Sequence, residues 1–219
     1  MKNIIYILLT LSFVIPKTAS TPGLFSISRI QYGGGGDWYA NQSSIPNLLE
    51  FISTNTSILV QLNENQVKVG DDLFYQNNYF YITGHGNITF TNEQIVILRN
   101  HLLNGSFLHV DDNYGLNKSF RKVLKQLFPE KELVELPKNH PIFNCYFKFE
   151  NGLPKIHEHN NESPQALGIF DNQKLILLYT YESDLGDGWE DKRVHNVLEE
   201  KREAALKMGT NIIIYSLTQ

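Results

Sequence analysis

The sequence contains one cysteine, Cys145, in 219 residues. An intramolecular disulfide is therefore excluded, and a chain of this length must be stabilised by its hydrophobic core. Basic residues are also few and scattered: 19 Lys and Arg stand against 23 Asp and Glu, for a net charge of -4. Because no basic cluster offers an electrostatic footprint for DNA or RNA, we expect no nucleic-acid partner.

Several catalytic motifs are missing as well. The chain has no Gly-x-Ser-x-Gly elbow, no Gly-Lys-Ser/Thr phosphate loop and no GxGxxG fingerprint. Cys145 follows Ile142-Phe143-Asn144 without a glycine elbow, so we do not expect a cysteine nucleophile. These absences argue against serine-hydrolase, P-loop, dinucleotide-binding and thiol chemistry.

The first twenty residues have the layout of a secretory signal peptide. Lys2 gives a positive start, an apolar run extends from Ile4 to Ile15, and Thr18-Ala19-Ser20 offers small residues for cleavage. The apolar run is short for a membrane span, although an uncleaved anchor is the alternative. We expect residues 1–20 to be removed and residues 21–219 to form one exported domain, periplasmic or extracellular, with no membrane span.

Hydrophobic periodicity in the rest of the chain predicts alternating strands and helices. The segments 24–32, 59–62, 79–82, 106–110 and 132–136 read as strands, and 166–170 with 175–181 as a hairpin. Helices are expected after Ser43, from Thr91, over 120–127, and from about 199 through Ile212–Ile214. This order predicts an α/β fold: a three-layer α/β/α arrangement around a mostly parallel sheet, with a late antiparallel hairpin.

Polar residues follow the predicted strands at four places, after Tyr32, Ile82, Val110 and Tyr181. In an open α/β sheet, ligands bind outside the carboxyl ends of the strands. If these strands are mutually parallel, the four polar loops gather at one edge and form the site.

Asp111 and Asp112 follow the strand 106–110 and begin a predicted turn. They are candidates for hard-cation ligands or a general base, or one of them caps a turn or the next helix. His85 lies between two glycines after the strand 79–82, so its ring could project into a cleft as a base or ligand, or bond a neighbouring loop.

His157-Glu158-His159 places two imidazoles on one side of an extended segment, where a carboxylate could complete a metal site. Solvated loop histidines are the alternative. The acidic residues Asp184, Asp187, Glu190 and Asp191 lie among glycines, but their spacing misses the EF-hand pattern. An acidic capped turn is the simpler interpretation there, and a calcium-like site the other.

The four glycines 33–36 could form an anion-binding nest or a tight turn that folds the next three residues over the sheet edge. We expect residues from all of these loops to bind the ligand together. They are Gly34, Gly35, Asp37, Trp38, Tyr39, His85, Tyr114, Asp184 and Trp189.

Longer motifs are also present: 29–39 (RIQYGGGGDWY), 83–86 (TGHG), 108–112 (LHVDD), 154–159 (PKIHEH), 184–191 (DLGDGWED) and 200–205 (EKREAA). In this combination the chain resembles the bacterial family called domain of unknown function 4159, over nearly all of residues 21–219. The resemblance implies a fold similar to class I glutamine amidotransferases, with a flavodoxin-like sheet. It also implies a cell-envelope role, because related domains are joined to membrane segments or encoded near MoxR-type ATPases and von Willebrand A-type proteins.

An active amidotransferase of that class needs a cysteine at a strand-to-helix elbow, where this chain carries Asp111-Asp112. Our first hypothesis is therefore an exported amidotransferase-like domain that binds a small polar ligand or an envelope protein without cysteine chemistry. The second is a metal-assisted hydrolase, with a divalent metal on His85, Asp111, His157 and His159, and Asp112 or Glu158 moving protons. The third is a non-catalytic envelope interaction module. Whether the protein is an enzyme stays open at this point.

Overall fold

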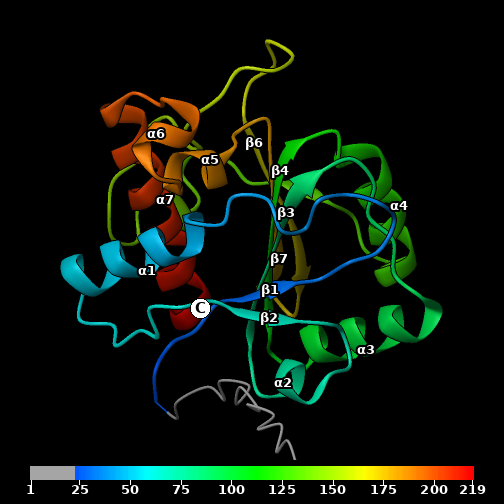
Figure 1. Ribbon diagram of the computed structural model, residues 1–219. Coiled ribbons are helices and arrows are strands. Elements are labelled where there is room, and N and C mark those ends of the chain that lie inside the picture. Colours follow the sequence, from blue (N-terminus) through cyan, green and yellow to red (C-terminus); the bar gives the residue numbers. More distant parts are fainter. Residues whose placement is uncertain (1–22) are drawn as a thin grey trace, which may run out of the picture.

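The computed structural model describes residues 23–219, and the expected signal peptide lies outside the described residues. A seven-stranded sheet runs through the molecule in the order β2-β1-β3-β4-β7-β6-β5 (Figure 1). The strands are β1 (Ser28–Ile30), β2 (Asn65–Val67), β3 (Tyr79–His85), β4 (Phe107–Tyr114), β5 (Val134–Glu135), β6 (Gln165–Asp171) and β7 (Lys174–Tyr181).

The sheet is mixed, with a parallel core. β2, β1, β3, β4 and β7 pair in parallel, and β6 pairs antiparallel with both β7 and β5. β6 and β7 are the predicted hairpin. The expectation of an α/β fold with a mostly parallel sheet and a late antiparallel hairpin is confirmed.

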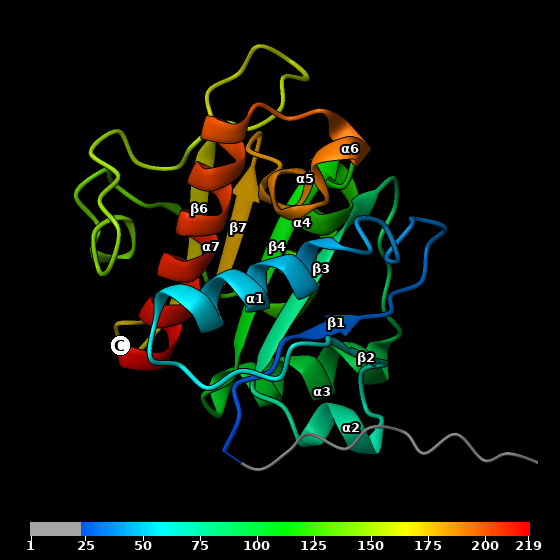
Figure 2. The same cartoon turned by 60° about the vertical axis from the view of Figure 1, so that its left-hand side comes forward.

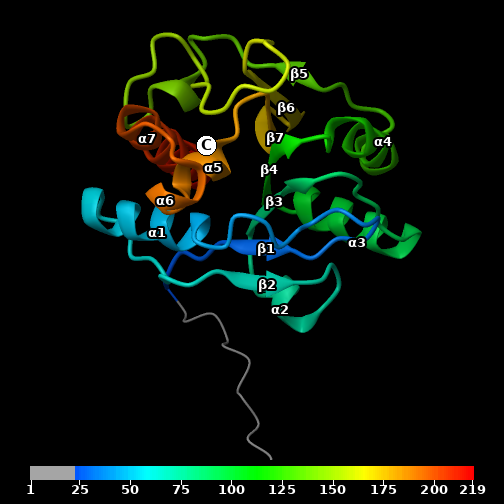
Figure 3. The ribbon, with the colours of Figure 1, turned by 45° about the horizontal axis from the view of Figure 1, so that its top comes forward.

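Helices cover both faces of the sheet (Figure 3). On one face lie α1 (Ser44–Asn55), α5 (Leu185–Trp189), α6 (Lys192–His195) and α7 (Glu199–Thr218), and on the other α2 (Asp72–Tyr75), α3 (Asn92–Leu103) and α4 (Asn117–Leu127). A 3-10 turn, η1 (Pro141–Phe143), packs beside α7. Each face has its own apolar core, one around Trp189 and Leu178 and the other around Phe120 and Tyr179.

Local sequence signals explain the helix ends. Thr91 and Gln94 form the predicted capping box at the start of α3, and Gly105, just past that helix, has a left-handed φ of 104°. α7 continues without a break through Ile212–Ile214, as expected, although this run would also suit a strand.

β1 is shorter than the predicted strand 24–32, and β3 is longer than the predicted strand 79–82. Two further strand boundaries were predicted wrongly. Residues 59–62 contribute only an isolated bridge between Phe25 and Val60, and the regular edge strand is Asn65–Val67. β4 continues through Tyr114, so Asp111 and Asp112 lie inside the strand and not in a turn. The reason for the second error is that the adjacent strand β3 extends equally far, to His85, and its backbone pairs with this polar stretch.

The carboxyl ends of β3, β4 and β7 lie side by side, because these strands are parallel neighbours. Figure 2 shows their arrowheads at the upper edge, with α5 and α6 close to it. Among the described residues, no helix is both long and apolar enough for a transmembrane span.

Candidate functional site

The pleat of β4 sends its two aspartates to opposite faces of the sheet. The Asp111 side chain is fully buried beneath α5. It accepts hydrogen bonds from the Thr180 hydroxyl at 2.5 Å and from the backbone N–H of Gly186 at 2.7 Å. Burial raises the pKa of Asp111 from 3.8 to about 6, although these hydrogen bonds oppose the shift. Asp111 therefore anchors α5 to the sheet, and it does not join the two histidines as we had expected.

Asp112 faces the other core. Its carboxylate accepts hydrogen bonds from the backbone N–H groups of Tyr114 and Leu116 and from the Tyr179 hydroxyl, at 3.0, 3.0 and 2.7 Å. These contacts fit the capping alternative, because they hold the turn that leads into α4. The geometry does not favour the predicted role of Asp112 in proton transfer.

His85 ends β3 at the same edge. Its Nδ1 lies 3.0 Å from Asp37 Oδ2, and its backbone N–H donates to the other oxygen of Asp37. Gly84 makes this close approach possible, because its φ is 133° and a Cβ there would lie 2.3 Å from the Tyr32 hydroxyl. His85 thus forms an exposed Asp–His pair beside the site, and Asp37 is its partner.

Of the two alternatives for glycines 33–36, an anion-binding nest and a tight turn, the contacts fit the tight turn. The N–H groups of Gly33 and Gly36 donate to the carbonyl oxygens of Thr89 and Asn87, at 3.1 and 2.9 Å. These donors are therefore unavailable to an anion, and the turn brings Asp37 against His85. Gly34 and Gly35 lie within this turn at positive φ.

His157 and His159 converge on Asp184, the residue that leads from β7 into α5. The ligand atoms of these three side chains all lie within 4.8 Å of one another. His159 Nε2 contacts Asp184 Oδ2 directly, and His157 Nδ1 lies 4.0 Å from the same oxygen. The predicted histidine pair thus finds its carboxylate in Asp184, where we had expected Asp111.

A second carboxylate, Asp187, touches this cluster from the middle of α5. Its Oδ2 lies 3.0 Å from His157 Nδ1, and its Oδ1 accepts from the side-chain amides of Asn41 and Asn113 at 2.9 and 3.3 Å. Oδ1 is also 3.5 Å from His195 Nε2. We use the name histidine–aspartate cluster for His157, His159, Asp184 and Asp187.

The backbone around the cluster is strained. Glu182 and Asp184 have left-handed φ angles of 55° and 58°, and Tyr114 has a φ of 137°, although none of them is glycine. Non-glycine residues with such angles concentrate at functional sites, where the surrounding structure holds them. All three lie at the carboxyl ends of β4 and β7, so the strain marks the same edge as the cluster.

Negative charge is crowded into this edge. The Asp184 side chain is fully buried, and its Oδ1 has no hydrogen-bond partner among residues 23–219. Burial, followed by the charges of Asp111 and Asp187, raises the pKa of Asp184 from 3.8 to about 10. A bound cation would compensate this crowding of carboxylates.

Four other predicted residues lie away from the cluster. Trp189 is buried in the core, where its indole N–H donates to the Ala205 carbonyl, because α5 folds back under α7. Glu158 points to solvent and pairs with Lys155 at 3.3 Å. Trp38 and Tyr39 pack edge-to-face on each other in the glycine-rich loop, and the Tyr39 side chain is exposed.

Tyr114, by contrast, reaches the cluster: its ring stacks on that of His159 with centroids 4.8 Å apart. Beside this pair opens a cavity of about 230 Å³. Polar and aromatic side chains line it, among them Tyr114, Asn117, Lys118, His159, Asn160 and Tyr181. A small polar group could enter there and lie next to His159.

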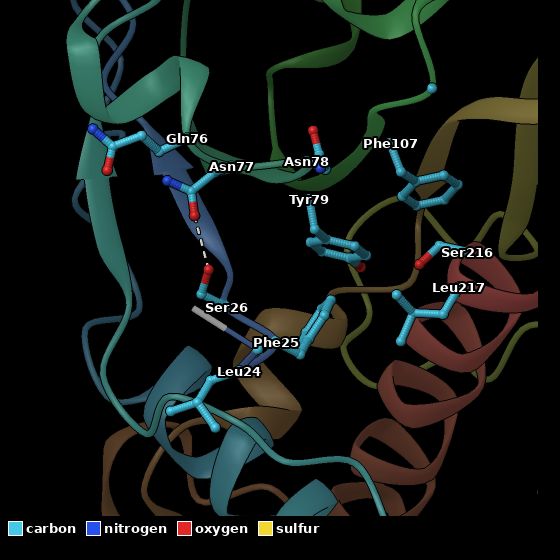
Figure 4. A pocket seen from close by; sticks show the side chains of 12 residues that line it. Leu24, Phe25, Ser26, Gln76, Asn77, Asn78, Tyr79, Phe107, Ser216 and Leu217 are labelled. Carbon is cyan, nitrogen blue, oxygen red and sulfur yellow. Dashed lines mark hydrogen bonds between the residues drawn. The ribbon is translucent and has the colours of Figure 1, made fainter. Parts of the chain in front are cut away.

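A larger cavity of about 430 Å³ lies at the opposite edge of the sheet, at the amino ends of β3 and β4 (Figure 4). Phe25, Tyr79, Phe107 and Leu217 line it together with Asn77, which accepts from the Ser26 hydroxyl. The histidines and carboxylates of the cluster lie at the other end of the strands, so this cavity is separate from the site.

The sequence analysis missed His195 and the two asparagines, Asn41 and Asn113, and considered Asp187 only as part of an acidic turn or a calcium-like site. Asn113 was accessible to sequence reasoning, since it alternates with His109 and Asp111 on one face of β4. No local pattern marks His195 or Asn41, because the fold alone brings them beside Asp187.

The two imidazoles and the Asp184 carboxylate converge, and Asp187 lies beside His157. This is the donor set of a transition-metal site, and it would suit zinc better than calcium or magnesium. Burial and the neighbouring His157 lower the pKa of His159, which keeps its ring neutral, the form that binds a metal. The arrangement can therefore hold a metal ion at the edge of the sheet, next to a polar cavity.

Comparison with known proteins places the chain in a family. No curated protein matches it. The model of one family, described as a domain of unknown function, matches residues 26–217, which is nearly all of the described chain. The protein is therefore a member of the DUF4159 family.

Proposed function

We propose that the protein is a metal-dependent hydrolase whose metal ion is bound by the histidine–aspartate cluster. The observation that carries this proposal is the convergence of His157, His159 and Asp184, whose ligand atoms lie within 4.8 Å of one another. The cluster differs from the ligand set expected from the sequence, because Asp184 replaces Asp111 and His85 stands beside the site with Asp37.

Two distances within the cluster bracket the separation between ligands of one metal ion, and the closer pair, His159 Nε2 and Asp184 Oδ2, would move apart on metal binding. Metal–ligand bonds of about 2.0–2.1 Å in a tetrahedron put the ligand atoms about 3.3–3.5 Å apart. His157 Nδ1 lies 4.0 Å from Asp184 Oδ2 and 3.0 Å from Asp187 Oδ2, which brackets that separation. Small side-chain adjustments would bring His157, His159 and Asp184 onto one ion, with Asp187 as a further ligand in a five-coordinate arrangement that keeps a position for a water.

The surrounding contacts support a preformed site. Asn41 and Asn113 donate to Asp187 Oδ1, and this leaves Oδ2 facing His157. Hydrogen bonds of this kind fix the orientation of ligating carboxylates. Thr83 in turn donates to Asn113 Oδ1 at 2.8 Å, so the neighbouring strand β3 holds the same network.

A metal ion in the cluster would act as a Lewis acid and lower the pKa of a coordinated water. The cavity of about 230 Å³ beside His159 would place the substrate next to that position, between Tyr114 and the side chains of Asn117 and Lys118. His85, oriented by Asp37 with half of its side chain exposed, is the candidate for proton transfer at this edge.

Elemental analysis of the protein purified without chelators tests the proposal. We expect stoichiometric zinc or another transition metal in the wild type, and its loss in His157→Ala and Asp184→Asn variants. His85→Ala is the matched control, because this exposed histidine lies at the same edge and, among residues 23–219, forms an ion pair with Asp37 alone. A wild-type protein that binds no metal after reconstitution with Zn²⁺ contradicts the proposal.

A second candidate function is a ligand-binding or envelope-interaction module with an amidotransferase-like fold, exported after removal of the signal peptide. Cys145 supports it over an active amidotransferase, because its sulfur lies beside the Asn211 carbonyl in α7, away from the cluster. A thermal-shift screen of the metal-free protein with sugars, amino acids, nucleotides and peptides tests this candidate. A stabilising ligand that is insensitive to His157→Ala would favour it.

A further inference from the structure

We infer that a second divalent metal ion binds beside the first, between Asp187, Glu190 and His195, with the Asp187 carboxylate bridging the two ions. This inference rests on the proposed function and extends it from one ion to two. Its carboxylates, Asp187 in α5 and Glu190 just after it, belong to the acidic segment noted in the sequence, whereas His195 in α6 was not expected at a site.

The second position is defined by two distances from His195. Its Nε2 lies 3.5 Å from Asp187 Oδ1 and 3.5 Å from Glu190 Oε2. Hydrogen bonds from a ring nitrogen to a carboxylate are shorter, about 2.7–2.9 Å. A separation of 3.5 Å instead matches two ligand atoms that share a metal ion with bonds of about 2.0–2.2 Å.

The nitrogen of His195 supports this interpretation in a second way. Its Nε2 atom is buried and has no hydrogen-bond partner among the described residues, although two carboxylates face it. A buried polar atom without a partner costs free energy. A metal ion that draws the Asp187 and Glu190 oxygens together beside this nitrogen would satisfy all three groups.

Ser43 holds the Glu190 carboxylate in position for metal binding. Its Oε1 accepts from the backbone N–H and the hydroxyl of Ser43, at 3.0 and 3.1 Å, and its Oε2 is left toward His195. The Glu190 side chain is buried, with 6% exposed. A buried carboxylate with one oxygen fixed and the other facing an imidazole is a preorganised ligand.

Asp187 connects the two positions. Oδ2 faces His157 in the first position and Oδ1 faces His195 in the second, where the ion would replace the longer of the two hydrogen bonds to Oδ1, the one from Asn113 at 3.3 Å. The rings of His157 and His195 are 6.1 Å apart between centroids, on either side of this carboxylate. Bridged ions in two-metal hydrolases are about 3.5–4 Å apart and stabilise both the attacking and the leaving oxygen of the substrate.

Metal counting distinguishes the inference from the proposed function. The full chain is stripped with a chelator, reconstituted with Zn²⁺ and measured by native mass spectrometry and elemental analysis. We expect two ions per wild-type chain and one in His195→Ala and Glu190→Gln. Glu199→Gln is the matched control, because Glu199 is exposed and pairs only with Lys192; it should keep two.

A wild type with one ion that His157→Ala removes would overturn the second position and leave the proposed function intact. A wild type with no ion would overturn both. His195 lies in the short, exposed helix α6, so its substitution should leave the fold unchanged, which circular dichroism checks. Loading with Mn²⁺ gives an independent readout: an exchange-coupled pair is expected in the wild type, and the spectrum of an isolated ion in His195→Ala.

Discussion

The ring of Tyr114 stacks on the imidazole of His159, with centroids 4.8 Å apart and planes inclined by 29°. Tyr114 is the last residue of β4 and His159 belongs to the loop before β6, so the contact joins a strand end to a segment without regular structure. The tyrosine therefore fixes the position of a proposed metal ligand from the scaffold.

Substitution of Tyr114 by Ala should weaken zinc binding about five-fold, because an aromatic pair contributes about 1 kcal/mol. Tyr114→Phe keeps the ring and should bind zinc as the wild type does. Competition titration with a chromophoric chelator measures both affinities. Equal affinities for the Ala and Phe variants would show that the stacking does not position His159.

Asp184→Asn should separate metal binding from stability. Zinc affinity should fall at least about 100-fold, since a ligand is lost. The free energy of unfolding of the metal-free protein should change by less than about 1 kcal/mol. The raised pKa means that Asp184 already carries a proton at neutral pH, and Asn mimics that form.

Urea unfolding and zinc titration of the same preparation check this pair of outcomes. Asp191→Asn, at an exposed carboxylate that contacts Asn47, serves as the control and should change neither quantity. A large loss of stability in Asp184→Asn would instead assign the carboxylate a structural role.

His109 should make the metal-free protein less stable in mild acid. Burial lowers the pKa of His109 from 6.5 to about 3, so the folded state stays neutral where the unfolded state takes up a proton. The stability from this residue is complete above pH 6.5 and is lost as the pH falls from 6.5 toward 3. The loss is about 2 kcal/mol at pH 5.

His109→Gln should remove this part of the pH dependence. Its free energy of unfolding, measured in urea at pH 8, 6.5 and 5, should fall less steeply with acid than that of the wild type. The variant also loses packing against Tyr81 and Trp189, so the slope and not the absolute stability is the test. Parallel pH profiles for the two proteins would contradict the assignment.

Gly209→Ala should destabilise the fold by about 2 kcal/mol, although alanine normally stabilises a helix interior. A Cβ at Gly209 would lie 2.7 Å from Leu48 Cδ1 and 2.8 Å from Trp189 Cζ2. Ser216→Ala, near the end of the same helix, is the control and should change stability little. Thermal unfolding compares the two, and a more stable Gly209→Ala variant would refute the close packing.

Much of the fold was predictable because apolar periodicity and capping signals act locally. The Thr91 capping box, the helical face of α4 and the hairpin of β6 and β7 all follow from residues close together in the sequence. The edge strand β2 was not predictable in this way, since Asn65-Gln66-Val67 has little apolar character and pairs with β1 through its backbone.

The site was predictable only in part. His85 lies at the expected edge because parallel strands bring their carboxyl ends together. His157 and His159 reach the same edge because their loop precedes β6, which is antiparallel to β7 and begins there. The roles of Asp111 and Trp189 were predicted wrongly because both side chains are buried. Asp111 lies at the polar end of β4, and Trp189 lies in α5, which packs into the core. His195 contacts Asp187 only through the tertiary arrangement of α5 and α6, which no spacing along the chain encodes.

The connection to β6 is long and irregular. Residues 144–164, all of them described, contain no helix or strand, and they carry His157 and His159 to the carboxylates of α5. A metal ion bound there would fix this long connecting segment to the sheet. Limited proteolysis should then cleave residues 144–164 first when a chelator is present. The lifetime of the intact chain would therefore depend on the metal concentration around it.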